Sequence, residues 1–323
     1  MRRMSYCQAL IEAQKEEMLR DSNVLIIGED IETFGGCFGQ TAGLFEKFGP
    51  ERVMNMPISE SGYVGMCVGL AMMGKRPIAE LMFADFGGYA FDSIANQAVK
   101  MRYQSGGQWQ VPMVIRAAQG AGVCAGETHS QCIEGWFQNV PALKIVVPST
   151  PADALGLLKS AIRDDDPVLF LEHKALMGLR GNVPDGDYTI PLGEANLVRE
   201  GKDVTIIAYQ VMLQHALAAA SELSKMGIEV EVIDPRTIWP FDYRKIADSV
   251  SKTGRALIVH ESPLRGGVGG EIAAFISDKC FTSLKAPVKR LGAADCFIPF
   301  NEAELFCYPG KDKIIAAVKD MMA

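Results

Sequence analysis

The sequence predicts an α/β protein of two domains, each a mostly parallel sheet with helices on both faces. Three observations lead to this prediction. A chain of 323 residues is long enough for two domains of about 150 residues each. Short runs rich in Val, Ile and Leu alternate with longer segments of helical periodicity, as strands and helices do in a parallel sheet. This alternation stops once, at residues 179–193, and then restarts.

We expect the first domain to span residues 1–185. Its first helix is expected to run to Arg20 from Ser5, because a serine hydroxyl caps the amides of a first turn well. Five strands and three more helices should follow: strands Val24–Ile27, Arg76–Phe83, Val111–Arg116, Lys144–Val147 and Val168–Leu171, and helices Gly62–Gly74, Asp85–Tyr103 and Ala152–Arg163.

We expect the second domain, residues 186–323, to repeat the same alternation. The segment Leu179–Gly193 concentrates Gly, Pro and Asp, which predicts an extended connector with the boundary near residue 185. Gly227 is the expected stop of a helix. The predicted elements are strands Asp203–Ala208, Val230–Ile233 and Arg255–Val259, and helices Met212–Met226, Ile272–Ser277 and Lys311–Met322.

Composition excludes several classes of protein. A formal net charge of −7 argues against nucleic acid or an anionic membrane surface as a partner. No apolar run reaches about 18 residues, so no membrane span is predicted. The start of the chain lacks the apolar core of a signal peptide, which predicts a cytoplasmic protein. The eight cysteines form no CxxC pair and should be reduced thiols, and four scattered histidines do not suggest zinc.

Glu60 is the first candidate for a functional residue. It follows the extended, proline-containing segment Met56–Ser59 and precedes the Gly-rich helix Gly62–Gly74. Loops beyond strand ends are where α/β folds place their sites. The alternative is that Glu60 is simply an acid in the first turn of a helix, where the helix dipole favours it.

His129 is the second candidate. It lies in the glycine-rich loop Ala117–Ser130, which opens at the end of a predicted strand. Glycines let a backbone approach a ligand closely, and a histidine can move protons near neutral pH. The alternative is a flexible loop with a solvated histidine.

Two further patterns receive structural interpretations. The run Arg265–Gly270 does not fit the spacing of a dinucleotide fingerprint, and we interpret it as a strand-to-helix turn. The aromatic residues Phe83, Phe86, Tyr89 and Phe91 are interpreted as core rather than as cofactor contacts. No phosphate-binding GxxxxGK[ST] loop occurs, which argues against nucleotide hydrolysis.

Seven motifs in order along almost the whole chain resemble one family: the beta subunits of the thiamine-diphosphate-dependent first component of 2-oxo acid or acetoin dehydrogenases, in the transketolase-like superfamily. The motifs are Ile26–Asp30, Pro57–Gly62, Phe83–Phe86, Arg102–Gly107, His129–Gln131, Lys144–Ser149 and Asp234–Ile238.

The resemblance implies a pyrimidine-binding domain followed by a transketolase C-terminal domain. It assigns Glu60 to the aminopyrimidine ring of thiamine diphosphate, where the carboxylate stabilises the protonated ring and so favours removal of the thiazolium proton. It places His129 near the reacting carbon, to stabilise intermediates or to help pass the acyl group to lipoamide. Met82 and Phe86 fall where the family packs the pyrimidine ring.

The resemblance also implies a potassium site in this subunit. Its ligands would be the backbone near Met113, Ala161 and Ile162, together with Asp164 and Asp166. Asp166 departs from an asparagine that is common at this place, which puts the site in doubt.

One family motif does not occur. Thiamine enzymes hold magnesium with Gly-Asp-Gly and a later asparagine, whereas this chain has only Asp185-Gly186-Asp187, in the wrong order and in the connector. A diphosphate needs a metal or dense positive charge. The resemblance therefore implies an alpha subunit that holds the magnesium and the diphosphate, in an α2β2 heterotetramer docked onto a dihydrolipoyl acyltransferase core.

Substrate and alternatives stay open at this level. The segments 172–178 and 181–184 resemble acetoin-type subunits, so pyruvate and acetoin are favoured over branched-chain 2-oxo acids, although Met177 replaces a frequent tyrosine. The alternatives are a non-catalytic scaffold or regulatory subunit of the same complex, and half of a transketolase-like sugar-phosphate synthase.

Overall fold

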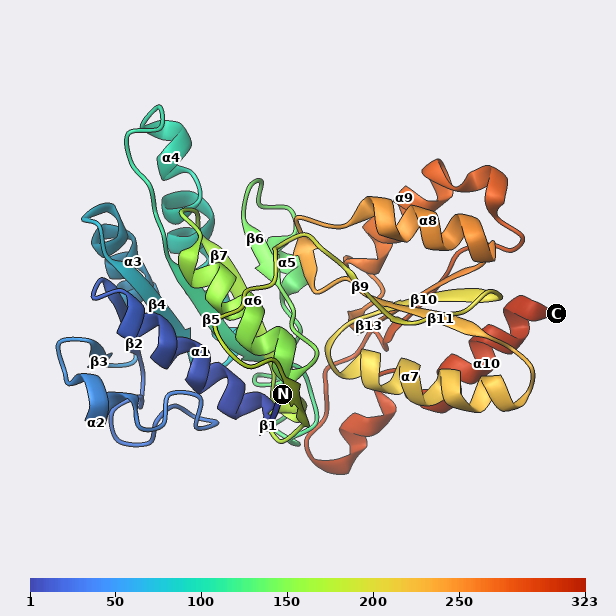
Figure 1. The fold of residues 1–323 in the computed structure, drawn as a ribbon, viewed down its shortest axis with the longest axis horizontal. Helices are drawn as coiled ribbons and strands as arrows, with labels where there is room; N and C mark the ends of the chain where they lie inside the picture. The colour runs from blue at the N-terminus through green and yellow to red at the C-terminus, as the bar shows by residue number, and fades with distance from the viewer.

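The first half of the chain is built around a seven-stranded sheet. A computed structural model describes all residues 1–323 (Figure 1). Neighbouring strands of this sheet are parallel except at β12, which pairs antiparallel with β6. In spatial order the strands are β12 (Thr237–Trp239), β6 (Lys144–Val146), β7 (Val168–His173), β5 (Val114–Gln119), β4 (Arg76–Leu81), β2 (Val24–Gly28) and β3 (Val53–Asn55).

A five-stranded sheet forms the second half. Only β9 runs antiparallel to its neighbour. The order is β14 (Lys289–Ala293), β13 (Ala256–Pro263), β10 (Val204–Ala208), β11 (Val230–Asp234) and β9 (Asn196–Arg199). The fold class predicted from sequence, mostly parallel sheets flanked by helices, is confirmed. The boundary near residue 185 stays a prediction.

Helices cover both faces of each sheet (Figure 1). In the first half, α1 (Tyr6–Arg20) packs beside α6 (Pro151–Arg163) on one face, and α3 (Glu60–Met72) packs with the π-helical turn η2 (Ser93–Ala98) on the other. In the second half, the paired helices are α7 (Gln210–Lys225) with α10 (Lys311–Met322), and α8 (Tyr243–Thr253) with α9 (Gly269–Lys279). The shorter helices are α2 (Leu44–Phe48), η1 (Ala84–Gly88), α4 (Met101–Gln104), α5 (Glu134–Phe137), η3 (Lys174–Leu176), η4 (Phe281–Ser283) and η5 (Asn301–Phe306).

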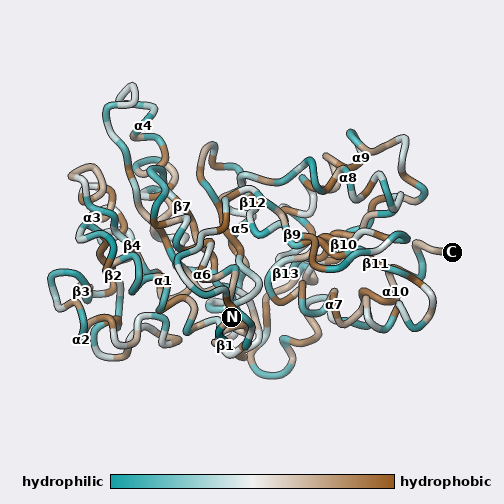
Figure 2. The backbone as a smooth tube through the Cα atoms, in the orientation of Figure 1, coloured by the Kyte–Doolittle hydropathy of each residue, from teal (hydrophilic) through white to brown (hydrophobic).

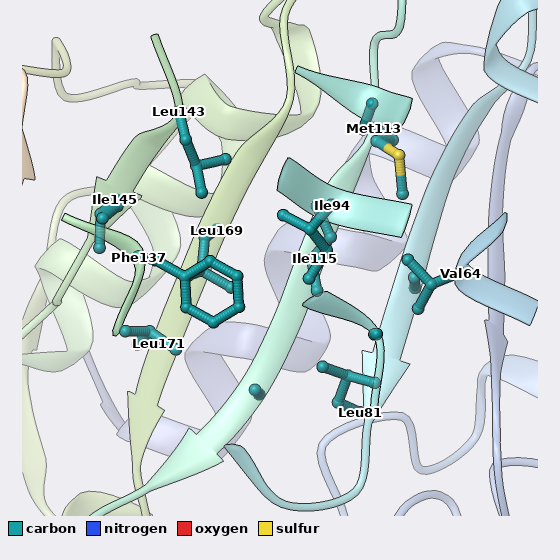
Figure 3. Close-up of a cluster of buried hydrophobic side chains, with 14 of the residues drawn as sticks. Val64, Leu81, Ile94, Met113, Ile115, Phe137, Leu143, Ile145, Leu169 and Leu171 are labelled. Atoms are coloured by element: carbon teal, nitrogen blue, oxygen red, sulfur yellow. The ribbon is translucent and has the colours of Figure 1, made fainter. Parts of the chain in front are cut away.

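The cores lie between the sheets and these helices. Brown stretches mark much of the strands at the centre of both halves in Figure 2, because both faces of a parallel sheet are buried. Figure 3 shows one core, where Val64 of α3 and Ile94 of η2 face Ile115 of β5 and Leu169 of β7. Met113 also points into this core and is 1% exposed.

The predicted first helix is confirmed with its cap. Ser5 Oγ accepts a hydrogen bond from the Gln8 amide at 3.1 Å, and the Ser5 amide donates to Gln8 Oε1 at 2.9 Å. This reciprocal arrangement satisfies two donors at the start of the helix. Gly227 ends α7 at a φ of 81°, as expected. The run Arg265–Gly270 is the turn between β13 and α9, also as expected.

Two predictions of local structure are wrong in part. The helix expected at Asp85–Tyr103 is instead three short pieces, η1, η2 and α4. Gly87, in the first of these pieces, lies close to the core, since a Cβ there would be 3.0 Å from Ile133 Cδ1. The connector is not free of pairing either: its residues Arg180–Val183 form β8, which pairs antiparallel with β1 (Arg2–Ser5).

Side chains also join the two halves. Tyr209 donates a hydrogen bond to Glu134 Oε1 at 2.7 Å, and both side chains are buried. Arg236 Nε lies 2.8 Å from Asp153 Oδ1. Together with β12, which crosses from the second half of the sequence into the first sheet, these contacts fix one half against the other.

Candidate active site

The candidate residues from the sequence gather at one edge of the seven-stranded sheet. Glu60 follows β3, Met82 and Phe86 follow β4, and His129 follows β5. These strands are parallel, so their carboxyl ends lie together at this edge. The strands β2 and β4 separate β3 from β5, so the loops bearing Glu60 and His129 begin about 14 Å apart at ~4.8 Å per strand.

Glu60 lies beside a second acid, Glu29. Glu60 begins α3 and is 7% exposed, and Glu29, just after β2, is 5% exposed. Burial raises the pKa of Glu29, and the neighbouring Glu60 carboxylate raises it further. Glu29 Oε1 is buried without a hydrogen-bond partner in the chain. The pair is therefore suited to a ligand that offers N–H donors and shares a proton.

Aromatic side chains gather around His129. Phe83 and Phe86 meet edge to face with ring centroids 5.8 Å apart, and Phe38 packs on Phe83 at 5.6 Å. The His129 ring lies against both, 4.5 Å from Phe83 and 5.5 Å from Phe86. The interpretation of these aromatics as core is wrong in part, since Tyr89 is 71% exposed.

The backbone and ring of His129 are both held. Thr128 Oγ1 lies 2.8 Å from His129 Nδ1, and His129 Nε2 has no hydrogen-bond partner in the chain. The Lys174 ammonium donates to the His129 carbonyl and lies 5.4 Å from the centre of the Phe83 ring. Burial lowers the pKa of Lys174. Gln131 Nε2 donates to Asp85 Oδ1 at 2.9 Å, which ties the loop to the aromatic segment.

Two carboxylates from the second half of the chain hold the glycine-rich loop. Glu261 accepts the Ala121 amide at 2.6 Å and contacts His173 Nε2 at 2.7 Å. Burial alone would raise the pKa of Glu261, but His173 and the Ala121 amide hold it below its ordinary value. Glu304 accepts the Gly122 amide at 2.8 Å. His129 therefore depends on both halves for its position.

A cavity of ≈ 160 Å³ opens between this loop and the second half. Ser130 lines it with a buried hydroxyl that has no partner. The polar side chains of the lining come from both halves: Glu127, Ser130, Gln131, Glu261, Ser262 and Arg265.

Residues 172–178, whose sequence favours pyruvate or acetoin, support the candidate site through contacts with other residues of the chain. Glu172 is fully buried and pairs with Arg116 at 2.5 Å. His173 and Lys174 make the contacts given above. These side chains are engaged with other residues of the chain, so the segment says little about which substrate is bound.

Sequence reasoning missed several of these residues. Glu29 could have been found, because it directly follows the buried run Val24–Gly28. Phe38, Glu261 and Glu304 carry no local signal, since they reach the site from distant parts of the chain.

The residues proposed to bind potassium do lie near one another, but cationic side chains already contact their oxygens. Arg76 donates to the carbonyls of Ile162 at 3.1 Å and Asp164 at 2.9 Å. Lys144 Nζ lies 2.6 Å from Asp164 Oδ1, and Arg102 Nε lies 2.7 Å from Asp166 Oδ1. Cationic side chains thus already contact the oxygens of Ile162, Asp164 and Asp166, and potassium binding stays a prediction.

No three His, Cys, Asp or Glu side chains converge in a way that could hold a metal ion. None of the helices combines the length and the apolar character needed to cross a membrane.

Comparison with known proteins identifies the family. Residues 2–179 match the transketolase pyrimidine-binding domain, and residues 193–314 match the transketolase C-terminal domain. A solved structure described as a split-gene transketolase, inactive beta4 tetramer, superposes with a TM-score of 0.81 at 27% identity, covering 99% of this chain and 98% of that one.

Curated relatives match over nearly the whole chain. The 2-oxoisovalerate dehydrogenase subunit beta of Bacillus subtilis is 47% identical, covering 98% of both chains. An acetoin:2,6-dichlorophenolindophenol oxidoreductase subunit beta of Cupriavidus necator is 46% identical, covering 99% of this chain and 98% of the relative. The pyruvate dehydrogenase E1 component subunit beta of B. subtilis is 43% identical, covering 100% and 99%. The chain therefore belongs to the family of beta subunits of the 2-oxo acid and acetoin dehydrogenases, built from transketolase pyrimidine-binding and C-terminal domains.

Proposed function

We propose that this chain is the beta half of a thiamine-diphosphate-dependent dehydrogenase that decarboxylates a 2-oxo acid such as pyruvate, or cleaves acetoin. The acyl group would then pass to the lipoamide of an acyltransferase. The family implies thiamine diphosphate as the cofactor. Bound here, it would supply a carbanion that attacks the substrate carbonyl and an electron sink for the bond that breaks.

The buried pair Glu29 and Glu60 is the observation that carries this proposal. An aminopyrimidine offers the N–H donors that the unpartnered Glu29 Oε1 lacks, and Glu60 would hold the proton on the ring. An ionised acid buried beside another acid is costly, so a ligand that brings a shared proton is stabilised there. The two acids thus fit the pyrimidine end of the cofactor.

The other residues complete a site for reaction. Phe83 and Phe86 would form an apolar wall that excludes water, with Met82 beside them on the same loop. His129 Nε2 would hold or move a proton near the reacting carbonyl. Because Glu261 and Glu304 fix the loop, the imidazole is positioned before substrate arrives.

We propose that an alpha subunit supplies the remaining part of the site, with the magnesium and the diphosphate contacts, in an α2β2 heterotetramer bound to a dihydrolipoyl acyltransferase core. The support is that the relatives are named as beta subunits. We also propose a cytoplasmic location, where the eight free cysteines stay reduced.

The substrate is the least constrained part. Relatives named for 2-oxoisovalerate, acetoin and pyruvate are 47%, 46% and 43% identical, and these values are too close to choose among them. Half of a transketolase-like enzyme is the second candidate, favoured only by the more distant structural relative.

Reconstitution tests the proposal. The chain is mixed with a candidate alpha subunit, thiamine diphosphate and magnesium. It is assayed with pyruvate, 2-oxoisovalerate or acetoin in the presence of 2,6-dichlorophenolindophenol as electron acceptor, and with a ketose phosphate in the presence of an aldose phosphate as acceptor. We expect turnover of a 2-oxo acid or acetoin. Turnover of the ketose phosphate alone would favour the transketolase reading, and no turnover at all would favour a scaffold.

Glu60→Gln tests the role of the acid. The amide keeps the shape but cannot hold the ring proton, so we expect a loss of turnover on the order of a hundredfold or more, with folding intact. Glu32→Gln is the matched control, because Glu32 is an exposed acid three residues after Glu29. A near-normal rate for Glu60→Gln would remove this acid from the mechanism.

A further inference from the structure

The segment 294–307 forms a closed loop with a cysteine at each side of its base. The Ala294 amide donates to the Cys307 carbonyl at 2.7 Å, and the Cys296 amide donates to the Ala294 carbonyl at 2.9 Å. These bonds bring Cys296 Sγ to 3.9 Å from Cys307 Sγ. The two cysteines are eleven residues apart in sequence. The closed loop, rather than a tight turn, therefore brings their thiols together. The loop lies at the lower edge of Figure 1, in red.

We propose that Cys296 and Cys307 are a modification site, an oxidisable dithiol that closes to a disulfide when the protein meets a peroxide. The sulfur atoms must approach by about 2 Å to reach bonding distance, which rotation of the exposed Cys296 side chain can supply. No other pair of the eight cysteines shows a sulfur–sulfur contact.

The chemistry follows from the different exposure of the two thiols. Exposed Cys296 meets the peroxide first: its thiolate attacks one peroxide oxygen, the O–O bond breaks, and after protonation the products are water and a sulfenic acid. The Cys307 thiolate then attacks that sulfur and expels hydroxide, which takes a proton to become a second water. The two thiols lose two electrons, and the peroxide gains them.

The environment of Cys307 controls the second step. Burial raises the pKa of the Cys307 thiol, and the neighbouring Cys296 raises it further, while the Lys313 ammonium opposes both. Ring closure needs the thiolate, so its rate should increase with pH.

The loop is attached to the candidate active site. Phe300 forms a β-bridge with Ala125, and Glu304 accepts the amides of Gly122 and Cys124. A disulfide across the base would therefore restrain the segment that holds the glycine-rich loop before His129. The linkage forms whether or not the chain oxidises 2-oxo acids, so peptide mapping tests it independently of the proposed function.

The experiment maps thiols in the full-length chain after hydrogen peroxide. Free thiols are alkylated and the protein is digested with trypsin, which releases both cysteines in one peptide, residues 291–311. A glutamate-specific protease then cuts after Glu302 and Glu304, between the two cysteines. We expect the two fragments to stay joined until a reductant is added, and to be joined faster at higher pH.

Matched variants decide the outcome. Cys296→Ser and Cys307→Ser should each abolish the link, whereas Cys37→Ser, which removes another exposed cysteine, should leave it unchanged. The proposal is overturned if both thiols are alkylated after peroxide, if Cys296 is over-oxidised while Cys307 stays a free thiol, or if Cys296 links two chains instead.

Discussion

Replacing Arg116 by methionine offers a severe test of how this fold is held together. Arg116 on β5 is fully buried between Glu172 of β7, at 2.5 Å, and Glu80 of β4, at 3.0 Å. It also donates to Gln14 Oε1 of α1 at 2.8 Å. The variant would leave two buried carboxylates without a cation, which typically costs about 3–5 kcal/mol of folding free energy.

The loss of folding free energy in Arg116→Met should depend on pH, and the burial of Glu80 determines whether it grows or falls as pH rises. Burial raises the pKa of Glu80 to about 7 from 4.5, although Arg116 opposes the rise. The folded chain therefore holds a proton on Glu80 that the unfolded chain releases, so this group's contribution to stability is full below pH 4.5 and is lost as pH rises to 7. A shift of this size corresponds to about 3 kcal/mol. In Arg116→Met the Glu80 carboxyl must ionise without help above neutral pH, so the cost should be larger at pH 8 than at pH 5, where Glu80 keeps its proton.

Urea unfolding at both pH values measures this directly. A variant that also carries Glu80→Gln and Glu172→Gln is the control, because it removes every charge of the cluster and should recover at least half of the loss. A cost below about 1 kcal/mol at pH 8, or one that is equal at the two pH values, would refute the reasoning.

Three further variants test separate parts of the structure. Ser5→Ala should lower the free energy of unfolding by about 1 kcal/mol in urea titration, because the first helix loses its cap; no change would mean that water replaces the hydroxyl. Gly120→Ala should cost about 1–3 kcal/mol by thermal unfolding, since Gly120 has a φ of 85° and a Cβ there would overlap the ring of His173; a neutral result would show that the loop can move aside. Tyr209→Phe removes the donor to buried Glu134 and should cost about 1–3 kcal/mol; equal melting temperatures would contradict this.

Much of the fold could be predicted because its signals are local. A buried parallel strand such as Val24–Gly28 is apolar on both faces, and an amphipathic helix such as Lys311–Met322 shows its period over three turns. Short strands at the edge of a sheet could not be predicted, because their signals are not local. Strand Thr237–Trp239 has only three residues, and its partner β6 is some ninety residues away in sequence. Strand Val111–Arg116 was placed three residues early, because Pro112 cannot donate to a ladder and pairing starts at Val114.

The site was predictable where a motif lies at a strand end. Glu60, Met82, Phe86 and His129 lie at one edge of the sheet because parallel strands end there together, although their roles stay proposals. The long-range contacts that hold the site in place could not be predicted. Glu304 reaches the loop from more than 180 positions away, and only the folded chain reveals such a contact.

The crossing of β12 into the first sheet has a consequence for anyone who wishes to divide the protein. A shortened chain ending at the connector would lack residues 237–239, and the hydrogen-bonding edge of β6 would be left bare. Bare edges invite other chains to add as strands. Such a fragment should aggregate during refolding, and adding a peptide that spans β12 should keep it in solution.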